Sequence, residues 1–249
     1  LNLVKKIYYE FSPSTYTEKA IFEKIEKAVR LNNTGQLMIL DLGCGGGNNR
    51  LTAYGTVHGV DVSEASVENA RKVYDAATVV DATAGLPFQD DSFDMVYCTE
   101  VLGHISHEHK EFFLSEARRV LRPGGYFVGS SETAGNNWYT RWLKRRGIYD
   151  LYWVEPWGHI GLISPTETVK LIKKFFNVLE TEKTSTWIPA LDAVVALDQI
   201  FSLLKIFRNT TMIRLGNMLI AVPFRMSIMF SEYDSANNIV LLARKDFVA

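Results

Sequence analysis

A cluster of glycines follows a short apolar stretch near residue 40 and could bring the backbone close to a ligand. Residues 39–48 read Ile-Leu-Asp-Leu-Gly-Cys-Gly-Gly-Gly-Asn. Glycines permit a tight turn, and a helix that begins after such a turn presents free N–H groups to a bound molecule. The dinucleotide pattern GxGxxG would begin at Gly43 and continue through Gly45, but its third glycine falls on Asn48. Hydride transfer is therefore disfavoured, whereas Asp41, two residues before the first glycine, suits a cationic amino group better than a phosphate.

Further acidic residues follow the next two strand-like stretches. Asp61 ends the stretch Gly-Val-Asp, and a carboxylate at this place can accept hydrogen bonds from both hydroxyls of a ribose. Asp81 and Ala82 end the stretch after that, where they can bind an adenine amino group and a ring nitrogen. Because ligands of open parallel sheets bind beyond the carboxyl ends of the strands, these pieces can converge on one nucleoside.

Three titratable residues are candidates for moving a proton during catalysis. Glu100 and His104 follow the fourth strand-like stretch, and His159 lies in Trp-Gly-His-Ile-Gly, in a loop expected to face the ligand cleft. Each can act as a general base if the substrate must lose a proton. For both histidines, a purely structural role is an equal alternative.

The elements that must position these residues alternate between strand-like and helical patterns. Strands joined by crossover helices predict an α/β fold with a parallel sheet covered on both faces. The predicted strands are 37–42, 57–62, 77–81, 93–99, 126–131, 178–184 and 239–244, and the predicted helices are 17–31, 63–75, 107–121 and 166–176.

Four motifs in order carry a family resemblance, at residues 39–47, 59–63, 86–98 and 121–128. They resemble the motifs of class I S-adenosylmethionine-dependent methyltransferases, and in particular the type 11 group that includes the ubiquinone-biosynthesis O-methyltransferases. The resemblance covers residues 37–131. It implies a Rossmann-like fold with a mostly parallel seven-stranded sheet, helices on both faces and a helical cap insertion.

The resemblance also implies which residues contact the cofactor, S-adenosyl-L-methionine. The methionine end would be held by Asp41, Gly43 and Gly45. The ribose and the adenine flank would be bound by Asp61 and Val62, the adenine edge by Asp81 and Ala82, and the methyl-bearing side would be lined by Thr99.

A metal requirement is not expected. Ubiquinone-type relatives carry Glu-x-x-Glu-His after the fourth strand, a cluster associated with a divalent cation. This chain reads Glu-Val-Leu-Gly-His over residues 100–104, so that Gly103 removes one carboxylate. The remaining Glu100 and His104, even with His107 and Glu108 nearby, are too few ligands for a hard cation.

Length and composition favour a single elaborated domain. The 249 residues carry 27 basic and 28 acidic side chains, so no overall field draws the chain to nucleic acid. The two cysteines, Cys44 and Cys98, cannot form a repeated CxxC metal site, and no signal peptide is expected, which favours a cytoplasmic location. The predicted parts are an N-terminal helical cap (1–35), a cofactor-binding core (36–133), an aromatic and basic lid (134–165) and a C-terminal part (166–249) with an apolar helical insertion (187–235).

Two segments outside the core are expected to determine the substrate and partners. The lid holds four of the five tryptophans beside several basic residues, which favours a cover over an aromatic or lipophilic small molecule, although such a loop can also stack bases or pack internally. Residues 187–230 are apolar, but charged residues interrupt them too often for a membrane span. Their helical spacing favours an amphipathic helix that closes the cleft, forms a homodimer, contacts a membrane peripherally or packs in the core.

These observations together predict methyl transfer to an oxygen or nitrogen atom of a small molecule. Two other classes of function stay open. One is a cofactor-binding scaffold or regulator without catalysis, and the other is a nucleotide-dependent oxidoreductase. RNA or protein is the alternative class of methyl acceptor.

Overall fold

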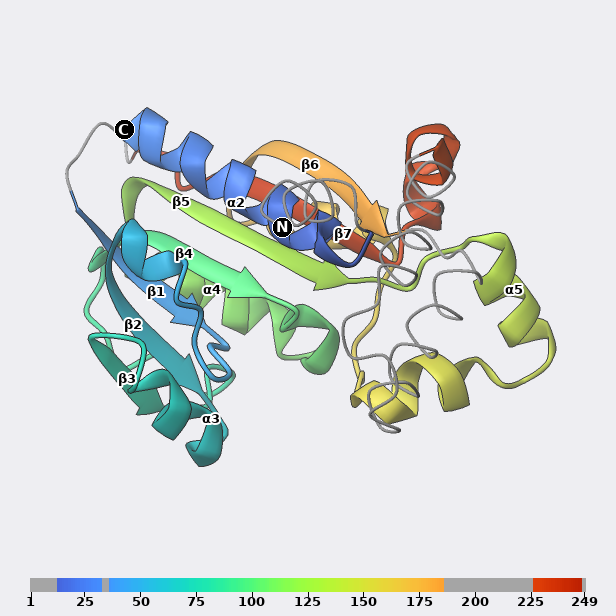
Figure 1. Cartoon of the computed structure of the whole chain (residues 1–249), viewed down its shortest axis with the longest axis horizontal. Helices are drawn as coiled ribbons and strands as arrows, with labels where there is room; N and C mark the ends of the chain where they lie inside the picture. The colour runs from blue at the N-terminus through green and yellow to red at the C-terminus, as the bar shows by residue number, and fades with distance from the viewer. Residues whose placement is uncertain (1–12, 33–35, 186–225, 248–249) are drawn as a thin grey trace, which may run out of the picture.

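The protein is built on one seven-stranded sheet. A computed structural model describes residues 13–32, 36–185 and 226–247. The strands lie in the order β3-β2-β1-β4-β5-β7-β6 (Figure 1). Neighbours from β3 to β5 pair in parallel, whereas β7 pairs antiparallel with both β5 and β6. The strands are β1 (Leu37–Leu42), β2 (Gly55–Asp61), β3 (Ala76–Val79), β4 (Phe93–Thr99), β5 (Leu121–Glu132), β6 (Asn177–Ser185) and β7 (Asn238–Arg244).

Helices cover both faces of this sheet. One buried cluster joins Ile25 of α2 and Val67 of α3 to one face, and a second joins Phe113 of α4 to the other. Because successive strand residues point to opposite faces, Ile39 and Leu40 of β1 are both fully buried, one in each cluster. The α-helices are α2 (Pro13–Asn32), α3 (Glu64–Ala70), α4 (Lys110–Val120), α5 (Trp138–Arg145) and α6 (Pro165–Lys173); single turns of 3-10 helix lie at Leu51–Ala53, Leu102–His104, Glu155–Trp157 and Tyr233–Ser235, and a π-helical turn at Asp150–Val154.

The predicted fold class is confirmed. β1 and β4 have their predicted bounds, the other elements differ from the prediction at one end or both, and the two largest differences have a physical reason. The helix after β2 ends at Ala70, before the predicted residue 75, because the chain turns there to bury Tyr74, whose hydroxyl donates a hydrogen bond to Asp41 at 2.6 Å. The strand predicted to begin at residue 126 begins at Leu121, because Leu121 pairs with Phe93 before an irregularity in the register.

The described part of the predicted N-terminal cap is α2, which packs on the sheet. It contacts β5, β6 and β7 and lies along them in Figure 1. Lys24 of α2 forms ion pairs with Glu180 and Glu182 of β6, at 3.2 and 3.0 Å. The described part of this segment is therefore a helix of the core layers.

Most of the apolar insertion predicted at 187–235 lies outside the described residues. Residues 226–230 are helical, and Met229 and Phe230 are exposed. Within the part of the chain that the structure describes, no helix has the length and apolar character needed to cross a membrane. A homodimer or a peripheral membrane contact through 187–230 stays a prediction.

Candidate active site

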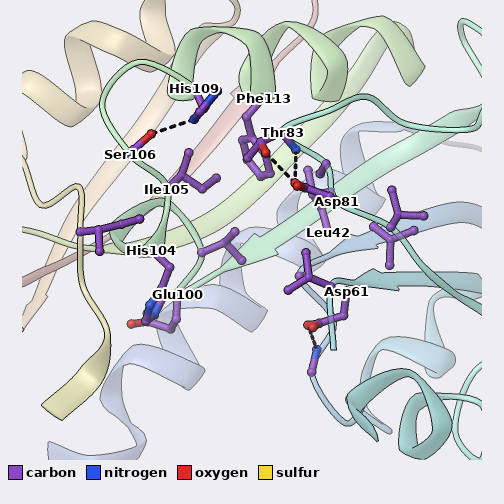
Figure 2. A pocket seen from close by; sticks show the side chains of 18 residues that line it. Leu42, Asp61, Asp81, Thr83, Glu100, His104, Ile105, Ser106, His109 and Phe113 are labelled. Carbon is purple, nitrogen blue, oxygen red and sulfur yellow. Dashed lines mark hydrogen bonds between the residues drawn. The ribbon is translucent and has the colours of Figure 1, made fainter. Parts of the chain in front are cut away.

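The carboxyl ends of β1, β2 and β3 and the loop after β4 surround a cavity of about 510 Å³. This volume lies within the range of roughly 300–1,000 Å³ that small-molecule sites occupy. Figure 2 shows Asp61 and Asp81 on one side of the cavity and Glu100 and His104 on the other. Six of the eight predicted cofactor residues line it: Gly43, Gly45, Asp61, Val62, Asp81 and Ala82.

The glycine turn after β1 forms one wall of the cavity. The N–H groups of Gly43 and Cys44 both donate to the carbonyl of Val60, at 2.9 Å, so the turn is fixed against β2. Gly43 has a φ of +82°, and a Cβ at this position would lie 2.3 Å from Cγ2 of Val101. Gly45 has a φ of +49° and open space where its Cβ would be. Both backbone conformations favour glycine, and the turn can approach a ligand closely.

Asp61 connects this turn to the start of the next helix. Its Oδ2 accepts a hydrogen bond from the N–H of Gly45 and its Oδ1 accepts one from the N–H of Ser63, both at 2.9 Å. An ionised carboxylate offers about four lone-pair positions, so these two bonds leave room for further donors. Asp61 also lines the cavity, where the two hydroxyls of a ribose could supply those donors.

Asp81, two residues after β3, is held by Thr83, which was not predicted as a site residue. Oδ1 of Asp81 accepts hydrogen bonds from the Thr83 side chain and N–H, at 2.6 and 2.9 Å. These bonds hold the pKa of Asp81 below its usual range. The Asp-x-Thr spacing is the available sequence signal, since Asp side chains commonly bind the backbone two residues on.

Two of the predicted cofactor residues, Asp41 and Thr99, are not among the residues that line the cavity. Asp41 lies beneath the glycine turn, is only 2% exposed and accepts the hydrogen bond from Tyr74. Burial, aided by the charge of Asp61, raises the pKa of Asp41 from 3.8 to about 7 against the opposing effect of the Tyr74 hydrogen bond. Any contact of this carboxylate with a ligand would have to be made through the turn.

The raised pKa of Asp41 predicts that Asp41→Asn stabilises the protein at high pH. The unfolded chain loses this proton near 3.8 and the folded chain near 7, so stability falls as pH rises between those values. The full shift corresponds to ~4 kcal/mol, and we expect about half, ~2 kcal/mol, as a gain in the free energy of unfolding at pH 8. Urea unfolding at pH 5 and pH 8 measures it. A gain of equal size at both pH values would contradict the assignment.

Of the three predicted catalytic residues, Glu100 and His104 line the other end of the cavity, and His159 lies beside His104 without lining it. Glu100 has a φ of +57°, unusual for a residue with a side chain, and Oε1 accepts hydrogen bonds from Ser130 and from Asn238, the latter at 2.8 Å. Burial, with the neighbouring Glu132 carboxylate as a second cause, raises the pKa of Glu100 to about 8. The ring centroids of His104 and His159 are 4.9 Å apart.

Glu132, the last residue of β5, completes this group and was not predicted. Its Oε1 lies 3.7 Å from Nε2 of His159. Burial lowers the pKa of His159, so its ring is mainly neutral at pH 7. The sequence around Glu132 has no motif that could have identified it. Its place beside Glu100 follows only from the parallel pairing of β4 with β5, in which Thr99 pairs with Ser130.

Comparisons with known proteins find methyltransferases. A sequence family described as "Methyltransferase domain" matches residues 40–129. The O-methyltransferase resE of Aspergillus sclerotiorum is 32% identical over 47% of this chain, and the 2-methyl-6-phytyl-1,4-hydroquinone methyltransferase of a Synechocystis strain is 38% identical over 36%. The matched regions span about half, 48%, of the first relative and 30% of the second.

Solved structures share the fold over nearly the whole chain. A putative sarcosine dimethylglycine methyltransferase from Galdieria sulphuraria superposes with a TM-score of 0.61 at 14% identity, covering 92% of this chain and 85% of that one. Residues 40–129 therefore match a methyltransferase domain, and the sheet and helices around them have the fold of class I methyltransferases. The family resemblance inferred from the sequence motifs is confirmed.

Proposed function

We propose that the protein binds S-adenosyl-L-methionine and transfers its methyl group to an oxygen or nitrogen atom of a small aromatic or lipophilic molecule. The observation that carries this proposal is the convergence of the glycine turn, Asp61 and Asp81 on one cavity whose far end holds Glu100 and His104. The first group suits a nucleoside that carries an amino acid, and the second lies where an acceptor would have to approach.

The chain's own contribution to the reaction is mainly orientation and exclusion of water. S-adenosylmethionine supplies a methyl group on a sulfonium, and its transfer removes charge as the acceptor attacks. Holding two reactants in line can lower a barrier by about 7–11 kcal/mol in favourable cases. The glycine turn and the two aspartates would fix the cofactor, while Ile105 and Phe113 give the cavity apolar walls.

A proton must leave when the acceptor is a hydroxyl or an ammonium group. His159, His104 and Glu100 are the catalytic residues we propose for this step. Neutral His159 can accept a proton at Nε2, and the nearby Glu132 carboxylate would stabilise the resulting charge. Glu100, with its pKa raised to about 8, holds a proton at neutral pH and can donate a hydrogen bond.

A second cavity, of about 720 Å³, supports a small-molecule acceptor. It is lined by lid residues such as Tyr149, Val154 and Leu162, together with His159. Ile160 lines both cavities, so the lid lies between the proposed cofactor and acceptor spaces. Two relatives whose names specify an O-methyltransferase and a phytyl-hydroquinone methyltransferase favour an oxygen or aromatic, lipophilic acceptor.

Calorimetric titration with S-adenosylmethionine, its demethylated product S-adenosylhomocysteine and NAD tests the proposal. We expect the two sulfur cofactors to bind and NAD not to bind. Preference for NAD would support an oxidoreductase and contradict methyl transfer. If the cofactor binds, a radiolabelled methyl group offered with small phenols, amines, RNA and protein separates the remaining alternatives. Binding without transfer to any of them would favour the scaffold.

A further inference from the structure

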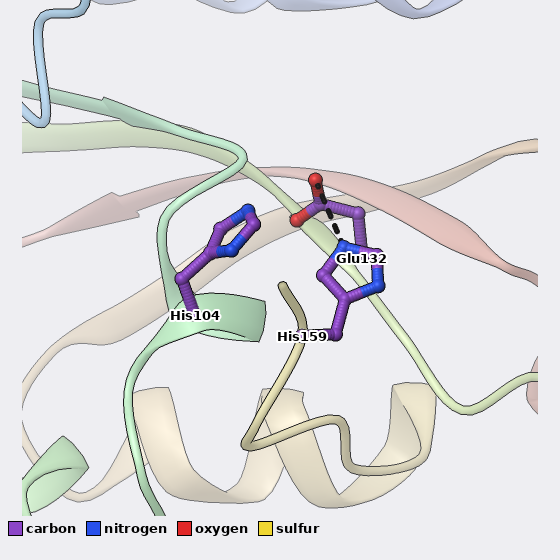
Figure 3. A group of neighbouring side chains, drawn as sticks. All are labelled: His104, Glu132 and His159. Carbon is purple, nitrogen blue, oxygen red and sulfur yellow. Dashed lines mark ion pairs between the residues drawn. The ribbon is translucent and has the colours of Figure 1, made fainter. Parts of the chain in front are cut away.

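Three potential metal ligands meet beside the cofactor cavity. His104 lies in the turn after β4, Glu132 ends β5, and His159 lies in the lid; we call these residues the His-Glu-His cluster. One ligand atom from each lies within 4.8 Å of the other two. Figure 3 shows the three side chains directed toward one another. His104 lines the cofactor cavity and His159 the second cavity, so the cluster lies between the two.

Backbone hydrogen bonds assign a hydrogen to the same nitrogen, Nδ1, of both rings. Nδ1 of His159 lies 2.7 Å from the carbonyl oxygen of Trp153, and Nδ1 of His104 lies 3.2 Å from that of Gly158. A carbonyl only accepts, so each Nδ1 must carry the hydrogen. A ring whose only hydrogen is on Nδ1 has its lone pair on Nε2. Metal-ligating histidines are commonly oriented by this arrangement.

Glu132 adds a carboxylate that lacks a full set of donors. Among the described residues its Oε2 is buried and has no hydrogen-bond partner, and its Oε1 faces Nε2 of His159. A proton on Glu100 could satisfy one of these oxygens, but it would leave the two imidazole lone pairs unexplained. Groups that all accept and none donate repel one another unless a cation lies between them.

Gly103 provides the space in which the cluster forms. A Cβ at this position would lie 3.2 Å from Cδ2 of His159 and 3.3 Å from Oε2 of Glu132. Its carbonyl also accepts hydrogen bonds from the N–H groups of Ile160 and Gly161, at 3.1 and 3.0 Å, which hold the lid in place. The glycine that interrupts the expected Glu-x-x-Glu-His motif thus allows a lid histidine to approach Glu132.

We propose that the His-Glu-His cluster binds a first-row divalent transition metal such as zinc. Two imidazoles and one carboxylate form a donor set that suits zinc and its neighbours better than magnesium or calcium, which prefer oxygen ligands. Three protein ligands leave coordination positions open. Ligands around zinc lie roughly 3.4 Å apart, so the three ligand atoms, now within 4.8 Å of one another, would have to move closer together on binding.

A metal in the His-Glu-His cluster would add a binding position for the methyl acceptor to the proposed function. Resting on that function, we infer that the open positions take a hydroxyl oxygen of the methyl acceptor. His104 and His159 would then hold the ion, a role that replaces the proton-accepting role proposed above. The proton of the coordinated hydroxyl would leave to water, because a bound divalent cation lowers the pKa of a coordinated hydroxyl. This site replaces the expectation that no metal is required, because two of its three ligands lie outside the 100–104 segment on which that expectation was based.

Metal binding can be tested without any methyl acceptor. The full chain is treated with a chelator, dialysed and titrated with Co²⁺, whose visible absorption reports nitrogen and oxygen ligands, and with Zn²⁺ by calorimetry. We expect one site per chain and no displacement by Mg²⁺. Glu132→Gln and His159→Ala should each lower the affinity for Zn²⁺ by roughly tenfold or more, with circular dichroism confirming that the variants are folded.

Two further variants make the test specific. Gly103→Ala keeps all three ligands but crowds them and should weaken Zn²⁺ binding several-fold. His58→Gln removes a histidine of β2 outside the cluster and should leave binding unchanged. Absent Co²⁺ absorption bands, or equal losses in His58→Gln and His159→Ala, would overturn the proposal. S-adenosylmethionine titrated into the same metal-free protein tests the proposed function separately, because cofactor and metal binding can each fail alone.

Discussion

Asp61→Ala is expected to lower the affinity for S-adenosylmethionine by roughly 100-fold or more. The carboxylate accepts hydrogen bonds from the N–H groups of Gly45 and Ser63, and it lines the cavity. Its loss therefore removes the proposed ribose contacts and also loosens the glycine turn. Hydrogen bonds to a charged group contribute about 1.5–3 kcal/mol each. Two of them give ~3–6 kcal/mol, which is at least two orders of magnitude in affinity. Calorimetry with the cofactor and with S-adenosylhomocysteine measures the change.

Asp75→Ala is the matched control for this substitution. Its carboxylate also accepts a backbone N–H, that of Val57 at 2.9 Å, but Asp75 does not line the cofactor cavity. Both variants should lose stability in thermal unfolding, and only Asp61→Ala should lose the cofactor. A cofactor affinity that is normal in Asp61→Ala, or reduced equally in both variants, would show that the cavity is not the nucleoside site.

Local sequence signals were sufficient to locate the cofactor side of the cavity. β1 was predicted with its observed bounds because its apolar run stops directly at the glycines of the turn. Asp61 and Asp81 were found because each follows a strand, and parallel strands bring such residues to one edge. These inferences need only the order of the elements and the alternation of strands with helices along the chain.

The acceptor side depended on contacts that no local pattern encodes. Glu132 follows two serines in a strand, and it becomes important only because β4 and β5 are neighbours. From the sequence, Gly103 could be interpreted only as a missing carboxylate. Its contact with His159 could not be predicted, because His159 lies in the lid, far away in the sequence. Likewise, α3 ends early because Tyr74 is needed beneath the glycine turn, a tertiary requirement that outweighs helical periodicity.

The glycines of the turn should separate effects on folding from effects on ligand binding. Gly43→Ala combines a φ of +82° with a Cβ only 2.3 Å from Cγ2 of Val101, so the turn must move. Left-handed strain costs roughly 1–2 kcal/mol, and the clash adds to it. We expect the free energy of unfolding to fall by ~3 kcal/mol and cofactor affinity to fall by roughly 100-fold, since the displaced turn no longer forms the same wall of the cavity.

Gly45→Ala should instead reduce binding with little loss of stability. Gly45 has a φ of +49° and no atom within 4 Å of the added Cβ, but it lines the cofactor cavity. Gly147→Ala is its matched control, with a φ of +67°, equally open space and no place in that cavity. Both should lose ~1 kcal/mol in urea unfolding, whereas only Gly45→Ala should weaken cofactor binding, by about tenfold or more. Wild-type affinity in Gly45→Ala would mean that the turn shapes the cavity without touching the cofactor, and the binding role would then rest on Asp61 and Asp81 alone.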